Sequence, residues 1–236
     1  MNEPFFLLLV GLGIIFIAVI FTYPGKGLFA LWKRSKRTNK KVDLEDALKY
    51  LYNCEYNNSV CTLNGIAGNL SISSDKATEI ISLLESTGLV KTNAEALILT
   101  SEGRSYALRV IRVHRLWEKY LADETSTNEK EWHKKAEELE HTLTSEEADR
   151  LAAQIGNPVF DPHGDPIPSS SGDIPAKKGK SLTEMNQGEF ANIIHIEDEP
   201  HAIYSQLIAE GLYPGMQIRM TEVSDKRIKF IANGDE

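Results

Sequence analysis

Cysteine is scarce in this sequence, where Cys54 and Cys61 are the only two among 236 residues. Two cysteines offer no disulfide framework, and these two do not form a Cys-x-x-Cys pair. We interpret both as reduced, half-buried thiols, with a role in metal binding as the less favoured alternative. The sequence also lacks a phosphate-binding loop and a pairing of nucleophile and base, so we do not expect an enzyme.

Acidic residues outnumber basic ones over most of the chain. The sequence holds 26 basic and 34 acidic residues, and seven of the basic ones fall between residues 26 and 41, where no acid occurs. With Glu3 upstream, residues 42–236 carry 19 basic against 33 acidic groups, a net charge of −14. A segment this acidic is a poor partner for DNA phosphates. The chain is long enough for two or three small domains.

An uncharged apolar run occupies residues 4–23, just before the basic stretch. Its length matches the roughly 30 Å hydrocarbon core of a bilayer. Positive charge after the run, rather than before it, argues against a cleaved secretory signal. We therefore expect a single-pass transmembrane anchor at residues 1–25 and a basic segment at 26–42 that contacts membrane lipid or, alternatively, nucleic acid. The positive-inside rule places the C-terminal domains in the cytoplasm, at the inner (cytoplasmic) membrane.

Residues 43–107 have the pattern of helices followed by a hairpin. Leu44, Leu48 and Leu51 recur at helical spacing, and a second apolar stripe runs through residues 75–85. Two short strands that flank a wing are expected after this stripe. Helix, helix-turn-helix and hairpin in this order predict a winged helix-turn-helix domain.

Imidazole and carboxylate side chains recur at helical spacing between residues 114 and 141. His114 precedes Glu118 by four residues, so the two share one face of a helix. The second array consists of His133, Glu137, Glu140 and His141. Two such arrays suit manganese, iron or zinc better than calcium. Two amphipathic helices with solvated charges are the alternative interpretation.

The C-terminal third changes in composition. Residues 165–180 are rich in proline, serine, glycine and lysine, which is typical of a linker. Alternating apolar residues at 190–196, a short helix around 201–210 and later strands predict a small β domain at 181–236.

The order of these features resembles one protein family. The winged-helix pattern is followed by His-Arg-Leu-x-Glu, by His-x-x-x-Glu-x-x-Glu-His and by Asp-Pro-His-Gly-Asp-Pro-Ile-Pro at residues 161–168. This arrangement is similar to the metal-dependent regulators of the diphtheria toxin repressor and manganese transport regulator family. The resemblance implies a mainly α fold with small β parts, namely a winged-helix domain at 43–107, a metal-binding and dimerisation domain at 108–164 and an SH3-like β-barrel of the FeoA type at 181–236. It also implies a homodimer that binds a palindromic DNA operator when loaded with metal.

Two metal sites follow from the resemblance. The primary site would comprise Asp46, Glu137, Glu140 and His141, and the second site His114, Glu118 and His133. In iron-sensing members the barrel adds polar ligands to the second site, and Glu199 and His201 fall near that place. Oxygen donors in the primary site favour manganese or ferrous iron. Lys49 stands where the manganese branch has a further glutamate, and its ammonium would occupy the space of a second cation there.

Four other side chains receive a structural interpretation. His163, within the proline-rich motif, and His195, within an apolar segment, are expected to serve the fold. Trp117 and Trp132 occupy helical positions suited to the core or to a dimer interface.

The resemblance places DNA contacts at the start of the helix over residues 75–85. The positions are Ser73, Ser74, Lys76 and Thr78. Asp75 and Glu79 add two carboxylates to the same stretch, and carboxylates repel phosphate. A winged helix that serves as a spacer or dimer element is therefore the alternative.

The sequence supports two functional hypotheses. The first is a membrane-tethered, metal-dependent DNA-binding transcriptional regulator of metal homeostasis, a repressor that responds to manganese or ferrous iron. The second is a non-DNA-binding accessory protein of a membrane metal transporter, which responds to metal and docks through its β domain and anchor.

Overall fold

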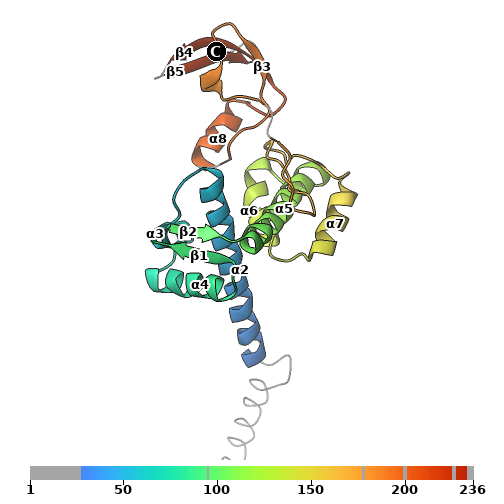
Figure 1. Cartoon of the computed structure of the whole chain (residues 1–236). Helices are drawn as coiled ribbons and strands as arrows, with labels where there is room; N and C mark the ends of the chain where they lie inside the picture. The colour runs from blue at the N-terminus through green and yellow to red at the C-terminus, as the bar shows by residue number, and fades with distance from the viewer. Residues whose placement is uncertain (1–27, 95, 177–178, 199–200, 225–226, 233–236) are drawn as a thin grey trace, which may run out of the picture. The chain divides into compact units, whose positions relative to one another are not determined.

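The computed structural model describes residues 28–236 except 95, 177–178, 199–200, 225–226 and 233–236. The chain divides into two compact units, Met1–Thr100 and Ser101–Glu236. Both units appear in Figure 1, with helices predominating and two small antiparallel sheets. This arrangement confirms the expectation of a mainly α fold with small β parts.

The first unit contains three helices and a hairpin among its described residues: α2 (Leu28–Tyr56), α3 (Leu63–Asn69), α4 (Ser74–Ser86), β1 (Val90–Asn93) and β2 (Ala96–Leu99). Ala47, Leu48 and Leu84 are completely buried, as the helical spacing of apolar residues predicts. The hydroxyls of Thr62 and Ser73 accept backbone N–H groups and cap α3 and α4. The order of helices and hairpin is the winged-helix order expected from the sequence.

The described part of the basic segment expected at residues 26–42 lies within a helix. Helix α2 begins at Leu28 and continues to Tyr56, so residue 42 falls inside a helix. Within this unit the Nζ atoms of Lys40 and Lys41 lie 3.2 and 3.5 Å from carboxylate oxygens of Glu79 and Glu45. These lysines form ion pairs within the protein.

The predicted location at the cytoplasmic membrane, as a single-pass protein with cytoplasmic C-terminal domains, needs correction. Among the described residues no helix is long and apolar enough to cross a membrane. Helix α2 has 29 residues and α5 has 24, but charged side chains interrupt both, so neither presents the continuous apolar length that a bilayer requires. The apolar run at 4–23, where the anchor was expected, lies outside the described residues.

Both cysteines lie in the interior of the first unit as free thiols. Burial, together with a hydrogen bond and charge interaction with Cys54, raises the pKa of Cys61 well above its ordinary value. The Cys61 thiol therefore stays protonated at neutral pH. This is the behaviour expected of a buried core thiol.

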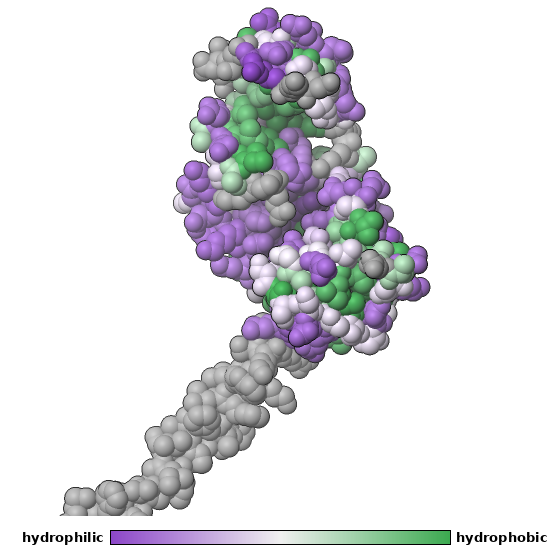
Figure 2. Space-filling view, turned by 90° about the vertical axis from the view of Figure 1, so that its left-hand side faces the viewer, coloured by the Kyte–Doolittle hydropathy of each residue, from purple (hydrophilic) through white to green (hydrophobic). Residues whose placement is uncertain are grey.

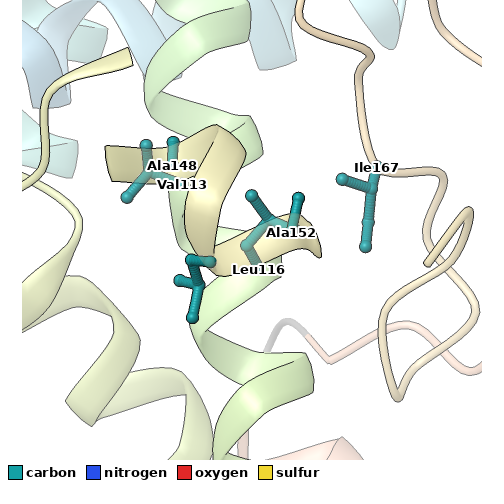
Figure 3. Packing of buried hydrophobic residues seen from close by; sticks show 6 residues of the cluster. Val113, Leu116, Ala148, Ala152 and Ile167 are labelled. Carbon is teal, nitrogen blue, oxygen red and sulfur yellow. The ribbon is translucent and has the colours of Figure 1, made fainter. Parts of the chain in front are cut away.

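The second unit begins with three α-helices and a short 3₁₀ turn: α5 (Ser101–Glu124), η1 (Glu129–Glu131), α6 (Trp132–Leu139) and α7 (Ser145–Gln154). The domain boundary expected after residue 107 therefore lies inside α5. Side chains of α5 and α7 interlock with one residue of the following loop in an apolar cluster (Figure 3), which contains Val113, Leu116, Ala148, Leu151, Ala152 and Ile167. Trp117 packs against this cluster, in agreement with its interpretation as a core residue.

The first residues of the expected linker belong to this core. Ile167 is only 3% exposed, and its N–H donates to the carbonyl of Val159. Arg112 and Arg115 of α5 donate to the carbonyls of Pro168 and Pro166 at 3.1 and 2.6 Å. Proline-rich composition alone could not reveal these side-chain anchors.

The C-terminal part of the second unit holds a small sheet and one helix: η2 (Leu182–Glu184), β3 (Phe190–Asn192), α8 (His201–Ala209), β4 (Gln217–Ser224) and β5 (Arg227–Ala232). The strands are antiparallel in the order β3-β4-β5 around a core of Met185, Met216, Ile218 and Met220. The expected closed barrel is not observed in the described part of the chain, because three strands are too few to close. Apolar side chains gather near α8 on the face shown in Figure 2. Ile203 of α8 is 54% exposed.

Strand β3 ends at Asn192, four residues before the predicted end of the apolar segment. Beyond it the chain leaves the sheet and runs beside the loop 161–165, and the N–H of Ile196 donates to the carbonyl of His163 at 3.0 Å. The residues that follow Asn192 are thereby brought close to helices α5 and α6.

Candidate metal centre

Helix α5 buries an imidazole and a carboxylate one turn apart. His114 is 7% exposed and Glu118 1%, and the Nε2 atom of His114 lies 3.0 Å from Oε1 of Glu118. His133, near the start of α6, places Nδ1 3.1 Å from the same oxygen and 3.3 Å from His114 Nε2. The structure therefore brings together all three residues expected in the second metal site.

Glu118 also belongs to a second triad, which it forms with His163 and Asp198. His163 is 3% exposed, and its Nε2 atom has no hydrogen-bond partner among the residues that the structure describes. That nitrogen lies 3.8 Å from Oε1 of Glu118. The carboxylate of Asp198 lies 3.1 Å from Nδ1 of His133, which links the two triads. We call the five residues of both triads the Glu118 cluster: His114, Glu118, His133, His163 and Asp198.

Charge interactions within the Glu118 cluster shift the pKa values of Glu118 and His133. Burial alone would raise the pKa of Glu118, but His114, His133 and His163 outweigh it and hold that pKa well below the ordinary value. Burial would likewise lower the pKa of His133, but Asp198, Glu118 and Glu137 raise it to about 12. Without metal the cluster thus contains an imidazolium surrounded by carboxylates. A divalent cation would replace this proton as the partner of the carboxylates.

The loop that carries His163 is fixed by Asp161 and Arg115. One oxygen of the buried Asp161 accepts the N–H groups of His163 and Asp165 at 2.9 and 2.8 Å. Arg115 lies 3.7 and 3.6 Å from the carboxylates of Asp161 and Asp165. Burial, Glu118 and Asp165 together raise the pKa of Asp161 well above its ordinary value.

The segment that carries Asp198 is held against the same loop. The backbone N–H of Ile196 donates to the carbonyl of His163, and Nε2 of His195 lies 3.2 Å from a carboxylate oxygen of Asp165. Tyr204 of α8 donates its hydroxyl to Glu129 at 2.8 Å, and its ring meets the His163 ring edge to face at a centroid distance of 5.0 Å. Asp198 is therefore positioned by contacts on both sides of it in the sequence.

Gly164 permits the closest of these approaches. Its φ is +92°, and a Cβ at this position would lie 2.0 Å from the carbonyl oxygen of Ile194. We expect Gly164→Ala to cost at least about 2 kcal/mol more of unfolding free energy than Gly188→Ala, and also to weaken metal binding. Gly188 is the matched control, because its φ is +84° with nothing within 4 Å of the added Cβ. Urea denaturation of both variants measures the difference, and equal losses would contradict the close approach.

The four residues expected in the primary metal site differ in their burial and in the side chains beside them. Glu140 is 3% exposed, and Oε2 lies 2.5 Å from Nδ1 of His114, while Oε1 lies 3.5 Å from Nε2 of His141. The more exposed Glu137 lies beside His133, with 3.5 Å between Oε1 and Nε2. Asp46 lies on α2 in the first unit and is half-buried. Glu140 thus connects the ligand sets of both expected sites, as a carboxylate behind a metal-binding imidazole does.

The sequence interpretation did not name Asp198 and His163 as candidate ligands, although the structure brings both of them to Glu118. Of the two residues that it did name in this segment, Glu199 lies outside the described residues and His201 begins helix α8. His163 was assigned a structural role. The Asp-x-His spacing at residues 161–163, directly before a glycine, was the signal that could have identified it.

The four residues expected to contact DNA lie at the start of α4. Ser73 is the N-cap of α4 and accepts the N–H of Lys76, and the hydroxyl of Thr78 donates to the carbonyl of Ser74. Ser73, Ser74 and Thr78 are exposed. The Nζ atom of Lys76 lies 3.2 Å from Asp43 and 3.9 Å from Glu79. The helix start therefore offers exposed hydroxyls, but its lysine is engaged by carboxylates.

Comparison with known proteins places these features in context. A family model for the metal-binding and dimerisation domain of iron-dependent repressors matches residues 100–169. The iron-dependent repressor IdeR of Mycobacterium tuberculosis (strain H37Rv) is 32% identical over 213 residues, covering 84% of this chain and 92% of that protein. A probable metal transport system membrane protein of Chlamydia trachomatis serovar D is 41% identical over 86 residues, 36% of this chain and 19% of that protein.

Solved structures agree with these sequence matches. A manganese-dependent transcriptional repressor in complex with manganese superposes with a TM-score of 0.72 at 27% identity, over 81% of this chain and 91% of that one. The crystal structure of ScaR with bound Zn²⁺ gives a TM-score of 0.70 at 27% identity, also over 81% of this chain and 91% of that one. The similarity therefore extends through both units.

Proposed function

This chain belongs to the iron-dependent repressor family, and we propose that manganese or ferrous iron switches it into the form that binds DNA. The protein is a metal-dependent transcriptional repressor with a divalent metal cofactor. Within that assignment, the proposed molecule is a homodimer that recognises a palindromic operator and regulates metal homeostasis. Its relatives over most of the chain are repressors and not enzymes.

The observation that carries this proposal is the buried Glu118 cluster. Its donors are two carboxylates and three imidazoles, with no sulfur among them. Oxygen and nitrogen donors of this kind favour manganese or ferrous iron over softer metals. The buried Nε2 atom of His163, which has no hydrogen-bond partner in the described part of the chain, supplies a lone pair that a cation would satisfy.

In this proposal the primary site would join the two units. Asp46 of α2 would share a cation with Glu137, Glu140 and His141, so that metal links the DNA-binding helices to the metal-binding helices. Without metal these carboxylates repel one another, and a cation replaces repulsion with attraction. Metal then favours the arrangement that it binds better, which is the one that fits the operator.

The accessory-protein alternative is not favoured. The match to a metal transport membrane protein covers 86 residues, whereas the match to repressors covers 213. The exposed hydroxyls at the start of α4 remain the proposed DNA contacts, namely Ser73, Ser74 and Thr78, together with Lys76.

A mobility-shift assay with DNA from upstream of the protein's own gene tests the function. We expect a shift that requires Mn²⁺ or Fe²⁺ and disappears with a chelator. Absence of any metal-dependent shift, in a protein that still binds manganese, would contradict the proposed repressor activity at that DNA.

Asp46→Ala tests whether the primary site couples metal binding to DNA binding. The substitution should weaken operator binding at saturating manganese by at least about tenfold, because the cation would lose its ligand on the DNA-binding unit. Manganese should still bind at the Glu118 cluster. Glu55→Ala, which removes an exposed carboxylate from the same helix, is the matched control, and an equal loss in both variants would contradict the role of Asp46.

A further inference from the structure

Helix α4 carries a carboxylate on the side opposite its buried stripe. The stripe consists of Ala77, Ile80, Ile81 and Leu84. At about 100° of rotation per residue, Asp75 lies about 170° around the helix axis from the centre of this stripe. Asp75 is exposed, and its side chain makes no hydrogen bond or ion pair with the residues that the structure describes. Asp75 therefore faces away from the core of the first unit.

The second carboxylate at the start of α4 belongs to a network of ion pairs. A carboxylate oxygen of Glu79 lies 3.2 Å from Nζ of Lys40, and the other lies 3.9 Å from Nζ of Lys76. The same Lys76 nitrogen lies 3.2 Å from Asp43. Two lysines and two carboxylates leave this network without net charge. Glu79 is thus compensated by neighbouring lysines, whereas Asp75 keeps its charge uncompensated in the described part of the chain.

An uncompensated carboxylate restricts what α4 meets on DNA. In helix-turn-helix proteins, the first residues of the recognition helix face base edges in the major groove. Two kinds of group donate hydrogen bonds there, the N4 amino group of cytosine and the N6 amino group of adenine. The adenine donor lies beside the acceptor N7, which repels a carboxylate, but the C5 edge of cytosine carries no acceptor. Cytosine is therefore the base that Asp75 fits.

Asp75 also lies in the first turn of α4, where a negative charge stabilises a helix. That effect accounts for an acid at this position, but it does not distinguish one DNA sequence from another. Repulsion from phosphate is equally independent of sequence. A preference for one base is thus the property that separates these roles from direct recognition.

We propose that Asp75 selects a cytosine in each half of the operator by accepting a hydrogen bond from the N4 amino group. This inference rests on the function proposed above, because it concerns the same DNA-binding helix. One such contact per protomer places the two selected C·G pairs symmetrically in a palindromic operator. Asp75 is then a specificity residue beside the exposed hydroxyls of Ser74 and Thr78.

Selection from a pool of random duplex DNA tests the proposal, with the full chain at saturating manganese. We expect the enriched sequences to contain a C·G pair at one position of each half-site. In Asp75→Asn this position should change to A·T, because an amide donates to N7 of adenine and accepts from N6, and the other enriched positions should stay the same. Competition mobility shifts should give each protein at least about a tenfold preference for its own base pair.

Glu79→Gln removes the other carboxylate from α4 and is the matched control. Lys40 and Lys76 would then be released, so binding to every sequence should strengthen while the selected bases stay unchanged. Asp75→Ala should lose the preference for cytosine without acquiring one for adenine. This variant decides the matter if Asp75→Asn does not fold.

The possible outcomes separate this inference from the function on which it rests. Identical enriched sequences for the unaltered chain and the Asp75 variants would overturn base selection by Asp75 and leave the metal-dependent repressor standing. A changed base in Glu79→Gln would also overturn the assignment to Asp75. No metal-dependent enrichment, in a folded chain that binds manganese, would overturn the proposed function and this inference with it.

Discussion

Replacing Glu118 with glutamine should weaken manganese binding at the Glu118 cluster by about a thousandfold. Loss of a group that only orients a ligand costs about tenfold to a hundredfold in metal affinity, and Glu118 is itself the donor that both triads share. Glutamine has nearly the same shape but no charge, so the three surrounding imidazoles would face a neutral amide. The stabilisation of the folded protein by manganese should disappear with the affinity.

Titration calorimetry and thermal melts with and without manganese measure this effect, in a chain that also carries Asp46→Ala so that the primary site does not contribute. Glu118→Asp keeps the charge but shortens the side chain by one methylene group, so we expect an intermediate affinity for manganese. Glu138→Gln removes an exposed carboxylate from α6 and should leave binding unchanged. Manganese affinity within tenfold of the parent chain, in a folded Glu118→Gln protein, would contradict the assignment.

Local periodicity explains why part of this centre could be predicted from the sequence. His114 and Glu118 are one helical turn apart, so their meeting requires only that α5 be a helix. The pairing of His133 with Glu137 follows from α6 in the same way. The caps at Thr62 and Ser73 and the apolar stripes of α2 and α4 are equally local, which is why the winged-helix order was predictable.

Asp198 could not be predicted with the same reasoning. Its position depends on where β3 ends and on how the following residues lie against the loop 161–165. Those contacts are a backbone hydrogen bond, an approach that only Gly164 permits and an ion pair of His195 with Asp165. None of them has a periodicity. The alignment therefore named Glu199 and His201, and not Asp198, as the candidate ligands from this segment.

The predictions of a closed barrel and of a membrane location were wrong for a related reason. Each was inferred from the composition of one segment, without knowledge of the residues that this segment contacts. Alternating apolar residues at 190–196 suggested a longer strand, but the chain leaves the sheet after Asn192, and Asp198 then lies 3.1 Å from His133. Contacts made outside the segment therefore override its local pattern.

The proton on His133 should make metal binding strongly dependent on pH. Burial alone would lower the pKa of His133, but Asp198, Glu118 and Glu137 raise it from 6.5 to about 12, so the unloaded protein keeps this imidazole protonated at neutral pH. An imidazole must lose its proton to bind metal. Glu118 and Asp198, whose pKa values are lowered, stay ionised near neutral pH. A proton held by Asp161, whose pKa is raised, would add to the release in the same direction.

We expect the affinity for manganese at the Glu118 cluster to rise about tenfold per pH unit between about pH 6 and pH 8, a change of about a hundredfold. The unloaded protein should respond in the opposite direction. Because the folded pKa of His133 lies above its unfolded value of 6.5, its contribution to stability is complete below pH 6.5 and is lost as pH rises towards about 12. Melting curves with and without manganese should therefore diverge as pH increases. Calorimetry in buffers of different ionisation enthalpy counts the released protons. The variant His133→Gln should bind manganese weakly and lose most of this slope, and an unaltered slope in that variant would assign the proton to another group.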